Sequence, residues 1–338
     1  MTTMQQSPEP PRVHVVATGG TIAMTDDDTG LKPRLSATDL VESVPQLGQV
    51  ARITTATHGT VPGAHLRLHD IRDIVIAAQA AIADGCAGVV VIQGTDTLEE
   101  TVFLADLLLG EQPSAPVVFT GAMRGSEQLG ADGAANILAS VRAAADPATR
   151  EQGAMLCMNG ELHAARTVTK SHAFSLAAFT SPMTGPLGWI AEDRVRLHGR
   201  IRPGRRFDAA TLPDELPPIA LHRVSLGDDA GLLAGLAGSD YRGLVVEAFG
   251  AGHVSAGLAE TLASISATMP VVVATRTGNG EVLRQTYGFP GSEIDLWRRG
   301  MIPAGSLDGL KARLLLAVSV AARLDRIEVE RAFESWST

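Results

Sequence analysis

The sequence predicts an α/β protein of two domains, a larger N-terminal domain with a mostly parallel sheet flanked by helices and a smaller C-terminal parallel-sheet domain. Three observations support this prediction. The chain has 338 residues, more than one hydrophobic core usually supports. Short apolar runs alternate with segments of helical periodicity, which is typical of parallel sheets covered by helices. The charged, proline-rich stretch 200–217 has no apolar period, so we interpret it as a linker.

The N-terminal half contains most of the expected strand–helix alternation. We interpret residues 1–11 as a disordered tail and residues 12–199 as the first domain, which opens with a buried strand over Val13–Ala17. The elements expected after it are a helix from the N-cap residue Ser36 to Val44, a strand over 52–57, a helix over 70–83, a strand over 89–93, a helix over 97–109, a strand over 116–120 and a helix over 132–145. Right-handed crossovers place the loops after parallel strands on one edge, so this order brings Thr21, Thr95 and Ala122 together.

The hydrophobic pattern of the chain changes at Gly153. Short alternating runs follow, which we interpret as hairpins added to one edge of the sheet and carrying Lys170 toward the other three residues. The second domain, residues 218–338, is expected to contain strands at 244–246 and 271–274, a helix over 255–267 and a last helix over 307–323.

Composition excludes several classes of protein. The formal net charge is −9, so a nucleic acid is not expected as a partner, and no apolar segment reaches the roughly 18 residues of a membrane span. The N-terminus lacks the pattern of a signal peptide, and Cys86 and Cys157 are the only cysteines, which together favour free buried thiols and a cytoplasmic location. His65 and His69 lie four residues apart near His58, but no carboxylate completes a metalloenzyme signature, so no metal or cofactor is expected.

Two loops that follow predicted strands each offer a threonine hydroxyl. The first is TGGTIA, Thr18–Ala23, where two glycines allow a sharp turn and a close approach of backbone N–H groups to a ligand. The second is GTDT, Gly94–Thr97. Ligands of open α/β sheets bind at such strand ends, which suggests one shared pocket, although a tight turn alone also explains a Gly-Gly pair. The polar stretch 24–35 beside the first loop is either a mobile lid or plain surface.

The residue types at these loops suit nucleophilic catalysis. Thr21 is a candidate nucleophile, but its hydroxyl needs a base or a hydrogen-bond network for activation. Lys170 would supply one if it were hydrogen-bonded to Thr95 and ion-paired with Asp96. Capping is the alternative for this motif, because Asp96 or Thr97 is followed three residues later by Glu99 or Glu100. Both interpretations can hold together, because a capped helix N-terminus points at a ligand.

The order of these motifs resembles the bacterial L-asparaginase family, whose members are also called asparaginase/glutaminases. TGGTIA and GTDTLEET each follow a strand, and GAMRGSEQLGADGAANI and TVTK come after them. The resemblance runs from Val13 to the last helix, and the pair of threonine motifs is highly specific because order, strand context and letters agree. It implies a large and a small α/β domain, a dimer within a tetramer as the active unit, and hydrolysis of L-asparagine to L-aspartate and ammonia through an acyl-enzyme.

The resemblance also implies a role for individual residues. Thr21 matches the nucleophile, and Thr95, Asp96 and Lys170 match the rigid part of the site. Asp96 would also bind the α-ammonium group of the substrate. The N–H groups of Thr21 and Ala122 would form the oxyanion hole. Counting back from the last helix places Glu293 where a neighbouring subunit contributes a substrate-binding glutamate, unless Glu293 is an exposed loop carboxylate.

Several positions depart from the family pattern. The lid usually contributes a tyrosine, but residues 24–35 contain none. Gly63 and Ala64 stand where a serine and its neighbour usually hold the α-carboxylate, although backbone N–H groups can also bind a carboxylate. His253 ends the loop GAGH where the family has asparagine or serine, unless it is a surface histidine. Only Cys86 lies near a position of the disulfide of the secreted subgroup, which agrees with a cytoplasmic protein. These departures concern substrate recognition and leave the Thr-Thr-Asp-Lys set complete.

Alternative functions remain beside asparagine hydrolysis. Weak activity on glutamine or another small amide is one, and a catalytically weak amino-acid-binding homologue is another. The archaeal subunit that supplies ammonia for amidating glutamyl-tRNA has an extra N-terminal domain, and the net charge of −9 here suits tRNA poorly. A nucleotide-binding oxidoreductase is excluded because no GxGxxG follows the first strand.

Overall fold

The structure of the protein is a computed structural model that describes residues 9–25, 32–111 and 113–337. Most of the stretch interpreted as a tail, residues 1–8, and the centre of the expected lid, residues 26–31, lie outside the described residues. Contacts between Cα atoms divide the chain into an N-terminal unit, residues 1–102 and 112–201, and a C-terminal unit, residues 103–111 and 202–338.

The N-terminal unit is built on a sheet of eight strands in the order β12-β11-β8-β7-β6-β5-β1-β4. The five parallel strands are β1 (Arg12–Gly19), β4 (Arg52–Val61), β5 (Gly88–Ile92), β6 (Val117–Thr120) and β7 (Ala154–Met158). The antiparallel strands β8 (Glu161–Ala164), β11 (Gly188–Ala191) and β12 (Arg194–Leu197) extend the edge beyond β7. This arrangement confirms the mostly parallel sheet and the hairpins at one edge.

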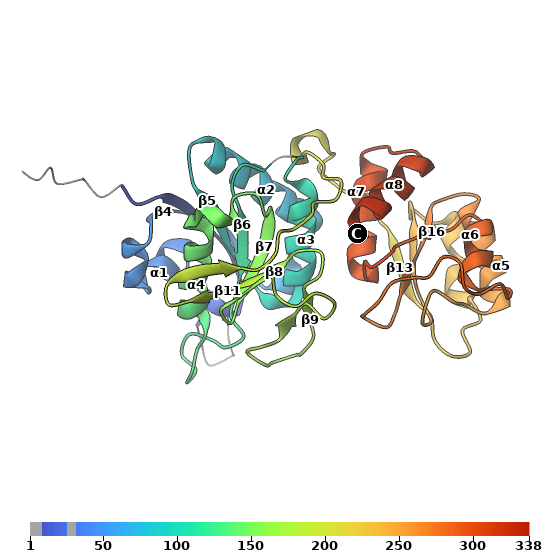
Figure 1. Ribbon diagram of the computed structural model, residues 1–338, viewed down its shortest axis with the longest axis horizontal. Helices are drawn as coiled ribbons and strands as arrows, with labels where there is room; N and C mark the ends of the chain where they lie inside the picture. The colour runs from blue at the N-terminus through green and yellow to red at the C-terminus, as the bar shows by residue number, and fades with distance from the viewer. Residues whose placement is uncertain (1–8, 26–31, 112, 338) are drawn as a thin grey trace, which may run out of the picture. The chain divides into compact units, whose positions relative to one another are not determined.

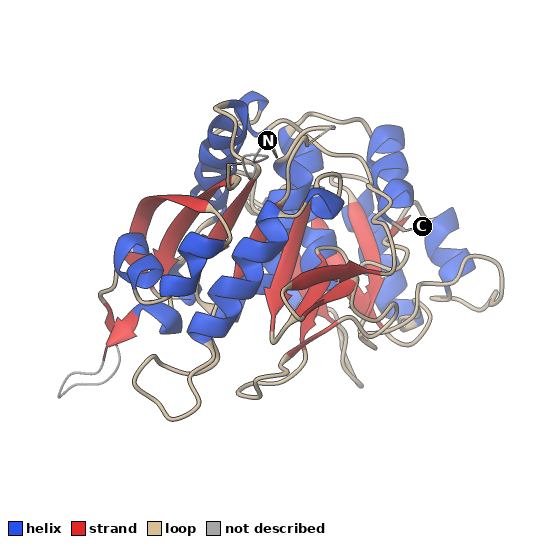
Figure 2. Ribbon diagram, turned by 60° about the vertical axis from the view of Figure 1, so that its left-hand side comes forward, coloured by secondary structure: helices blue, strands red, loops and turns tan. Residues whose placement is uncertain are grey.

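Helices cover both faces of this sheet, which explains why its central strands are apolar throughout rather than alternating. The helices are α1 (Ala37–Glu42), α2 (Leu68–Ala83), α3 (Leu98–Leu108) and α4 (Gly133–Ala145). Val13, Val15 and Val90 share one core with residues of α1 and α4, whereas α2 packs on β1 and β5 from the other side. Figure 1 shows α1 and α4 on one side of these strands and α2 on the other, and Figure 2, coloured by secondary structure, shows helices packed beside the strands.

Two short hairpins lie outside the main sheet. Strands β2 (Met24–Thr25) and β3 (Lys32–Pro33) pair at the two ends of the expected lid. Strands β9 (Thr169–Lys170) and β10 (Phe179–Thr180) pair in the excursion between β8 and β11, with Lys170 opposite Phe179. Lys170 is therefore carried by two residues of strand and needs further contacts to hold its position.

The C-terminal unit contains a second parallel sheet, in the order β13-β14-β15-β16. Its elements are β13 (Ala220–Arg223), β14 (Leu244–Ala248), β15 (Val271–Thr275), β16 (Ile302–Pro303), α5 (Ala256–Ser266), α6 (Glu293–Arg298), α7 (Gly309–Ala321) and α8 (Arg326–Trp336). Helix α5 lies within the helix expected over 255–267, and the Ser255 hydroxyl caps it by accepting the Leu258 N–H. The buried ion pair between Arg206 and Asp106, at 2.8 Å, ties the segment after residue 201 to the end of α3 within this unit.

Two boundaries expected from sequence are wrong. The helix expected to be last is followed by α8, which starts from a capping box between Asp325 and Glu328 and buries Trp336 against Phe103 at a ring distance of 5.1 Å. The mean hydropathy of α8 is low because many of its residues are charged, so the sequence gives no strong apolar signal for this helix. The strand expected to end at Thr57 continues to Val61, because backbone pairing with β1 persists to Gly19 through a turn-rich sequence.

Candidate active site

Three loops at one edge of the N-terminal sheet pack backbone against backbone. They are the short 3-10 turns Thr21–Ala23 after β1, Gly63–His65 after β4 and Thr95–Thr97 after β5. A Cβ atom on Gly20 would lie 2.2 Å from the Gly94 nitrogen, and one on Gly94 would lie 2.9 Å from the Gly63 nitrogen. No side chain fits at these contacts, so the glycines of TGGT and GTDT allow the two threonine loops to approach each other. We call Gly20, Gly63 and Gly94 the glycine junction.

The loop after β6 reaches the same place. A Cβ atom on Gly121 would lie 3.1 Å from the Thr95 methyl carbon. A Cβ atom on Gly133, at the start of α4, would lie 2.9 Å from Ile22 and 3.6 Å from the Ala122 methyl carbon. The loops that carry Thr21, Thr95 and Ala122 therefore meet at the carboxyl edge of the parallel strands, as the strand order predicts.

Thr95, Asp96 and Lys170 form a connected polar group. The Lys170 Nζ atom donates to the Thr95 hydroxyl at 3.0 Å and to an Asp96 carboxylate oxygen at 2.9 Å. Both contacts that we expect from sequence are present. Thr95 is 6% exposed, whereas the Asp96 side chain is 70% exposed. The group thus pairs a buried hydroxyl with a carboxylate that remains open to a cationic ligand.

Glu99 holds the backbone of Lys170 in place. The sequence did not identify Glu99 as a site residue. Its buried carboxylate accepts a hydrogen bond from the backbone N–H of Lys170 at 3.1 Å. The Thr97 hydroxyl donates instead to the Gly63 carbonyl oxygen at 3.1 Å. These side chains make contacts between loops, as the interpretation of this motif as part of a site requires. A signal was available, because Glu99 lies four residues after Thr95 and residues at this spacing share a helix face.

Thr21 occupies a less constrained position. The next two residues, Ile22 and Ala23, are buried and join the core beneath α1 and α4. Thr21 itself is half-buried, and its hydroxyl has no hydrogen-bond partner among the residues that the structure describes. Its loop is therefore anchored by the apolar packing of Ile22 and Ala23.

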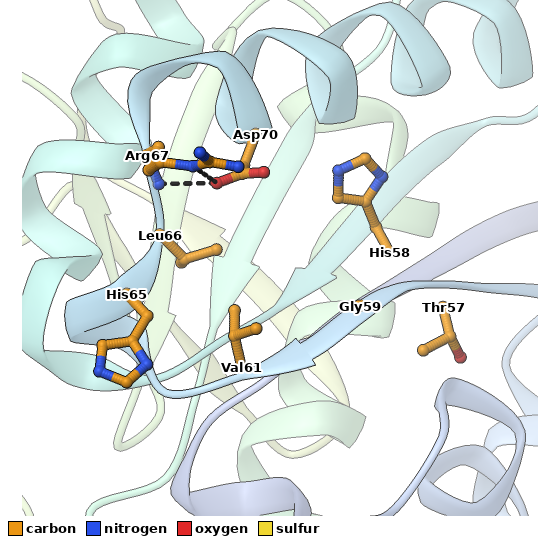
Figure 3. A pocket seen from close by; sticks show the side chains of 8 residues that line it. All are labelled: Thr57, His58, Gly59, Val61, His65, Leu66, Arg67 and Asp70. Atoms are coloured by element: carbon orange, nitrogen blue, oxygen red, sulfur yellow. Dashed lines mark hydrogen bonds and ion pairs between the residues drawn. The ribbon is translucent and has the colours of Figure 1, made fainter.

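Gly63 and Ala64 face opposite surroundings. Gly63 is buried, and a Cβ atom there would lie 3.2 Å from the Gly94 carbonyl carbon, whereas Ala64 is exposed. A cavity of about 470 Å³ lies beside this turn, lined by Thr57, His58, Gly59, Val61, His65, Leu66, Arg67 and Asp70. Figure 3 shows the imidazoles of His58 and His65 well apart, and the Asp70 carboxylate accepts the Arg67 N–H at 2.7 Å. Gly63 itself therefore offers only its backbone groups at this turn.

His253 and Glu293 belong to the C-terminal unit, and their surroundings there correct one expectation. Glu293 is fully buried at the start of α6 and is not an exposed loop carboxylate. Burial opposes its ionisation, but the N–H groups of Tyr287 and Thr286, at 2.7 and 2.8 Å, together with its own N–H and the nearby His253, outweigh burial and lower its pKa. The His253 Nε2 atom lies 3.2 Å from its other oxygen. Both carboxylate oxygens are thus engaged, and the imidazole is the more exposed group of the two.

The two cysteines are free and buried. Burial raises the pKa of Cys157 to about 12, so this thiol is not a nucleophile at neutral pH. Within residues 9–25, 32–111 and 113–337, no three histidine, cysteine or acidic side chains are arranged to hold a metal ion. None of the described helices has both the length and the apolarity to cross a bilayer.

Comparison with known proteins agrees with this geometry. Residues 12–202 match the family model of the asparaginase N-terminal domain, and residues 219–333 match that of the glutaminase/asparaginase C-terminal domain. The probable L-asparaginase of Deinococcus radiodurans is 34% identical over 96% of this chain and 97% of its own length. The L-asparaginase of Bacillus licheniformis is 30% identical over 94% of this chain and 98% of its own length. The solved structure of a probable cytoplasmic L-asparaginase from Campylobacter jejuni, 28% identical, superposes with a TM-score of 0.84 and covers 96% of this chain and 99% of that one.

Proposed function

This chain belongs to the asparaginase family of amidohydrolases, and from that premise we propose that it hydrolyses L-asparagine to L-aspartate and ammonia with Thr21 as the nucleophile. The observation that carries the proposal is the position of Lys170, whose ammonium contacts both the Thr95 hydroxyl and the Asp96 carboxylate at the edge where the Thr21 loop meets the Thr95 loop. These contacts support a site that combines the Thr21 hydroxyl, a polar network and a carboxylate for the substrate ammonium.

In this mechanism, the Thr21 oxygen attacks the side-chain amide carbon as its proton passes to the Thr95 oxygen. Thr95 passes its own proton to the Lys170 nitrogen, which releases one of its protons to the Asp96 carboxylate, and the relay later runs in reverse. The tetrahedral oxyanion is stabilised by the N–H groups of Thr21 and Ala122. Collapse breaks the C–N bond, and the proton leaves with ammonia. Water then attacks the acyl-enzyme, restoring the Thr21 hydroxyl and releasing aspartate. The expected lid contains no tyrosine, so activation rests on this network alone.

Substrate recognition is divided between charged and backbone groups. The exposed Asp96 carboxylate binds the α-ammonium group, since one of its oxygens contacts Lys170 and the other is open to a ligand. Backbone N–H groups at Gly63 and Ala64 bind the α-carboxylate, because neither residue offers a polar side chain. Glutamine or another small amide is the second candidate substrate, favoured by the absence of the serine hydroxyl at Gly63.

The test is ammonia release from L-asparagine, L-glutamine and D-asparagine by wild type, Thr21→Ala and Thr95→Val. Both variants should lose at least about 10³-fold in kcat on the preferred amide, because each removes a hydroxyl required in proton transfer or attack. Thr101→Val is the matched control, since Thr101 is a similarly buried threonine whose hydroxyl, among the described residues, bonds only the Leu98 carbonyl of its own helix. A wild type that binds aspartate but releases no ammonia from any amide would contradict the proposal and identify a binding homologue.

We also propose a homotetramer or homodimer in which His253, held by Glu293, contacts the substrate bound to a neighbouring subunit. The buried, doubly engaged Glu293 carboxylate supports a positioning role for that residue and a contact role for the imidazole. Sedimentation at assay concentration is the test, and a fully active monomer would contradict it. The free thiols and the similarity to a probable cytoplasmic relative support a cytoplasmic location, which cell fractionation would check.

A further inference from the structure

The loop between β6 and α4 contains a buried backbone donor, the Ala122 N–H, that has no partner among the described residues. Ala122 is 1% exposed, and among the described residues its N–H donates to no recorded acceptor. Buried backbone N–H groups are nearly always paired, because an unpaired one loses its hydration without a replacement. This donor is the one that the proposed mechanism assigns to the oxyanion. Something must therefore hold the loop in this unfavourable arrangement.

Asn136 fixes the peptide unit that contains this donor. Its side chain is 2% exposed, and its Nδ2 atom donates to the Gly121 carbonyl oxygen at 3.0 Å. The Gly121 carbonyl and the Ala122 N–H belong to one planar trans peptide unit and point in opposite directions. Holding the oxygen therefore sets the direction of the N–H. The Asn136 Oδ1 atom in turn accepts the Asn159 N–H at 3.0 Å, which anchors the amide to the turn after β7.

Asp132 holds the other side of Ala122. Its carboxylate accepts the Met123 N–H at 3.0 Å and the Arg124 N–H at 3.0 Å, and it also accepts from Asn136 Nδ2 at 3.0 Å. Asp132 is the N-cap residue of α4, yet within the described part of the chain its carboxylate accepts no capping hydrogen bond from the backbone N–H groups of its own helix. The carboxylate that would ordinarily cap the helix is turned toward the loop instead.

We propose that Asp132 and Asn136 are positioning residues of the oxyanion hole, which together aim the Ala122 N–H at the developing oxyanion without touching the substrate. This inference rests on the proposed function. It explains the sequence GADGAAN, because the two residues lie four apart at the start of α4 and so project from one helix face toward the same loop. A donor aimed in advance stabilises the transition state without reorganisation during the reaction.

The experiment compares the isosteric variants Asp132→Asn and Asn136→Asp with wild type and with Ser140→Ala. Ser140 is a buried residue one turn along α4 whose hydroxyl bonds the Asn136 carbonyl oxygen, so its loss disturbs the same helix without altering the clamp on Ala122. The measurements are kcat and KM for ammonia release, and calorimetric affinities for L-aspartate and for an aspartate-like boronic acid that forms a tetrahedral adduct with a hydroxyl nucleophile.

Each isosteric variant should lower kcat by roughly 10- to 100-fold, with KM and the affinity for L-aspartate within about twofold of wild type. Affinity for the boronic acid should fall by the same factor as kcat, whereas Ser140→Ala should change neither. Wild-type kcat in both variants, an equal loss of aspartate affinity, or failure of both variants to fold would overturn the inference. Failure of the proposed function is distinct, because it shows as activity retained by Thr21→Ala or absent from wild type.

Discussion

The loops after β1 and β5 have the same plan and different outcomes. Both follow neighbouring parallel strands, both place a glycine before a threonine, and both make a single 3-10 turn. Thr95 is buried, bonded to Lys170 and followed directly by α3. Thr21 is half-buried, has no hydroxyl partner among the described residues and is followed by β2 of a short hairpin.

The difference teaches that the surroundings of a motif, rather than the motif itself, decide what its threonine can do. The hydroxyl of Thr95 is part of a fixed network, which suits proton transfer at a set distance. In the proposed mechanism, the hydroxyl of Thr21 reacts with the carbonyl carbon of a substrate. The buried neighbours Ile22 and Ala23 fix the backbone of its loop but do not contact this hydroxyl through a hydrogen bond. One loop is therefore suited to guide protons and the other to form and break a bond.

Replacement of Lys170 by methionine should have the largest effect, because it leaves Thr95 as unpartnered as Thr21 and removes the ion pair with Asp96. We expect kcat to fall by roughly 10²- to 10³-fold, the range of a lost acid–base group. Steady-state ammonia release measures this change. Lys170→Arg retains charge and donors, so equal losses in both variants would show that the position of the amine, and not its charge alone, matters. Wild-type kcat in Lys170→Met would refute the network.

Gly20→Ala should come next, since it forces the two loops apart. Its Cβ atom would lie 2.2 Å from the Gly94 nitrogen at a φ of +84°. We expect a loss of about 1–3 kcal/mol in the free energy of unfolding and of roughly 10- to 100-fold in kcat. The matched control is Gly85→Ala, where φ is +90° and no heavy atom lies within 4 Å of the added carbon. That variant shares the backbone strain and should retain wild-type kcat, so a similar kcat loss in both would count against the junction.

Glu99 tests whether the fixed loop depends on the support beneath Lys170. Glu99→Ala removes the acceptor for the Lys170 N–H and should lower kcat about tenfold by loosening β9. Glu99→Gln keeps an acceptor oxygen and should restore most of this loss. Comparing kcat with KM in the two variants checks the idea. If glutamine and alanine are equally impaired, the negative charge rather than the hydrogen bond is what matters.

His163 should have the smallest effect on turnover and a measurable one on stability. The residue lies on β8, bonds the Ser181 hydroxyl at 3.0 Å, and has Glu161 at 3.3 Å without hydrogen-bond geometry. Burial lowers the pKa of His163 to about 4. The unfolded chain therefore binds a proton at a higher pH than the folded one, and stability falls as pH decreases from about 6.5 to 4, by about 3 kcal/mol from this group.

Urea unfolding of wild type and His163→Asn between pH 8 and pH 4 checks this dependence. The variant should be less stable at pH 8, because it loses packing, yet should lose about 3 kcal/mol less than wild type on acidification. Parallel curves for the two proteins would show that the imidazole is already protonated in the folded state or gains solvent access at low pH.

Much of the fold was predictable because its signals are local. A few consecutive residues are enough to recognise an uninterrupted apolar strand, the glycine turn after it, or the cap at Ser36. Helix α8 was not predictable, because it is rich in charged residues. The extension of β4 to Val61 was not predictable either, because it depends on pairing with β1. Length and the proline-rich stretch 200–217 suggested two units, but not that residues 103–111 belong to the second one.

The candidate site divides in the same way. The threonine loops and Lys170 were found from motifs, and the contacts of Lys170 with Thr95 and Asp96 are present. The supports were not found, since Glu99 and Asp132 look like ordinary helix-start carboxylates in the sequence. Only the coordinates show that their oxygens accept N–H groups from other loops. A side chain that accepts hydrogen bonds from the backbone of a distant segment cannot be recognised from the residues next to it in the sequence.

The glycine junction has a consequence for attempts to alter specificity. At the junction, the backbones of three loops are in direct contact. A side chain even as small as a methyl group does not fit between them, so substitutions there cannot adjust the width of the site. Libraries that randomise Gly20 or Gly94 should return almost entirely the parent residue. Adaptation to other amides will have to come from positions that already carry side chains around the rim, such as Ala64, where the surface leaves room for change.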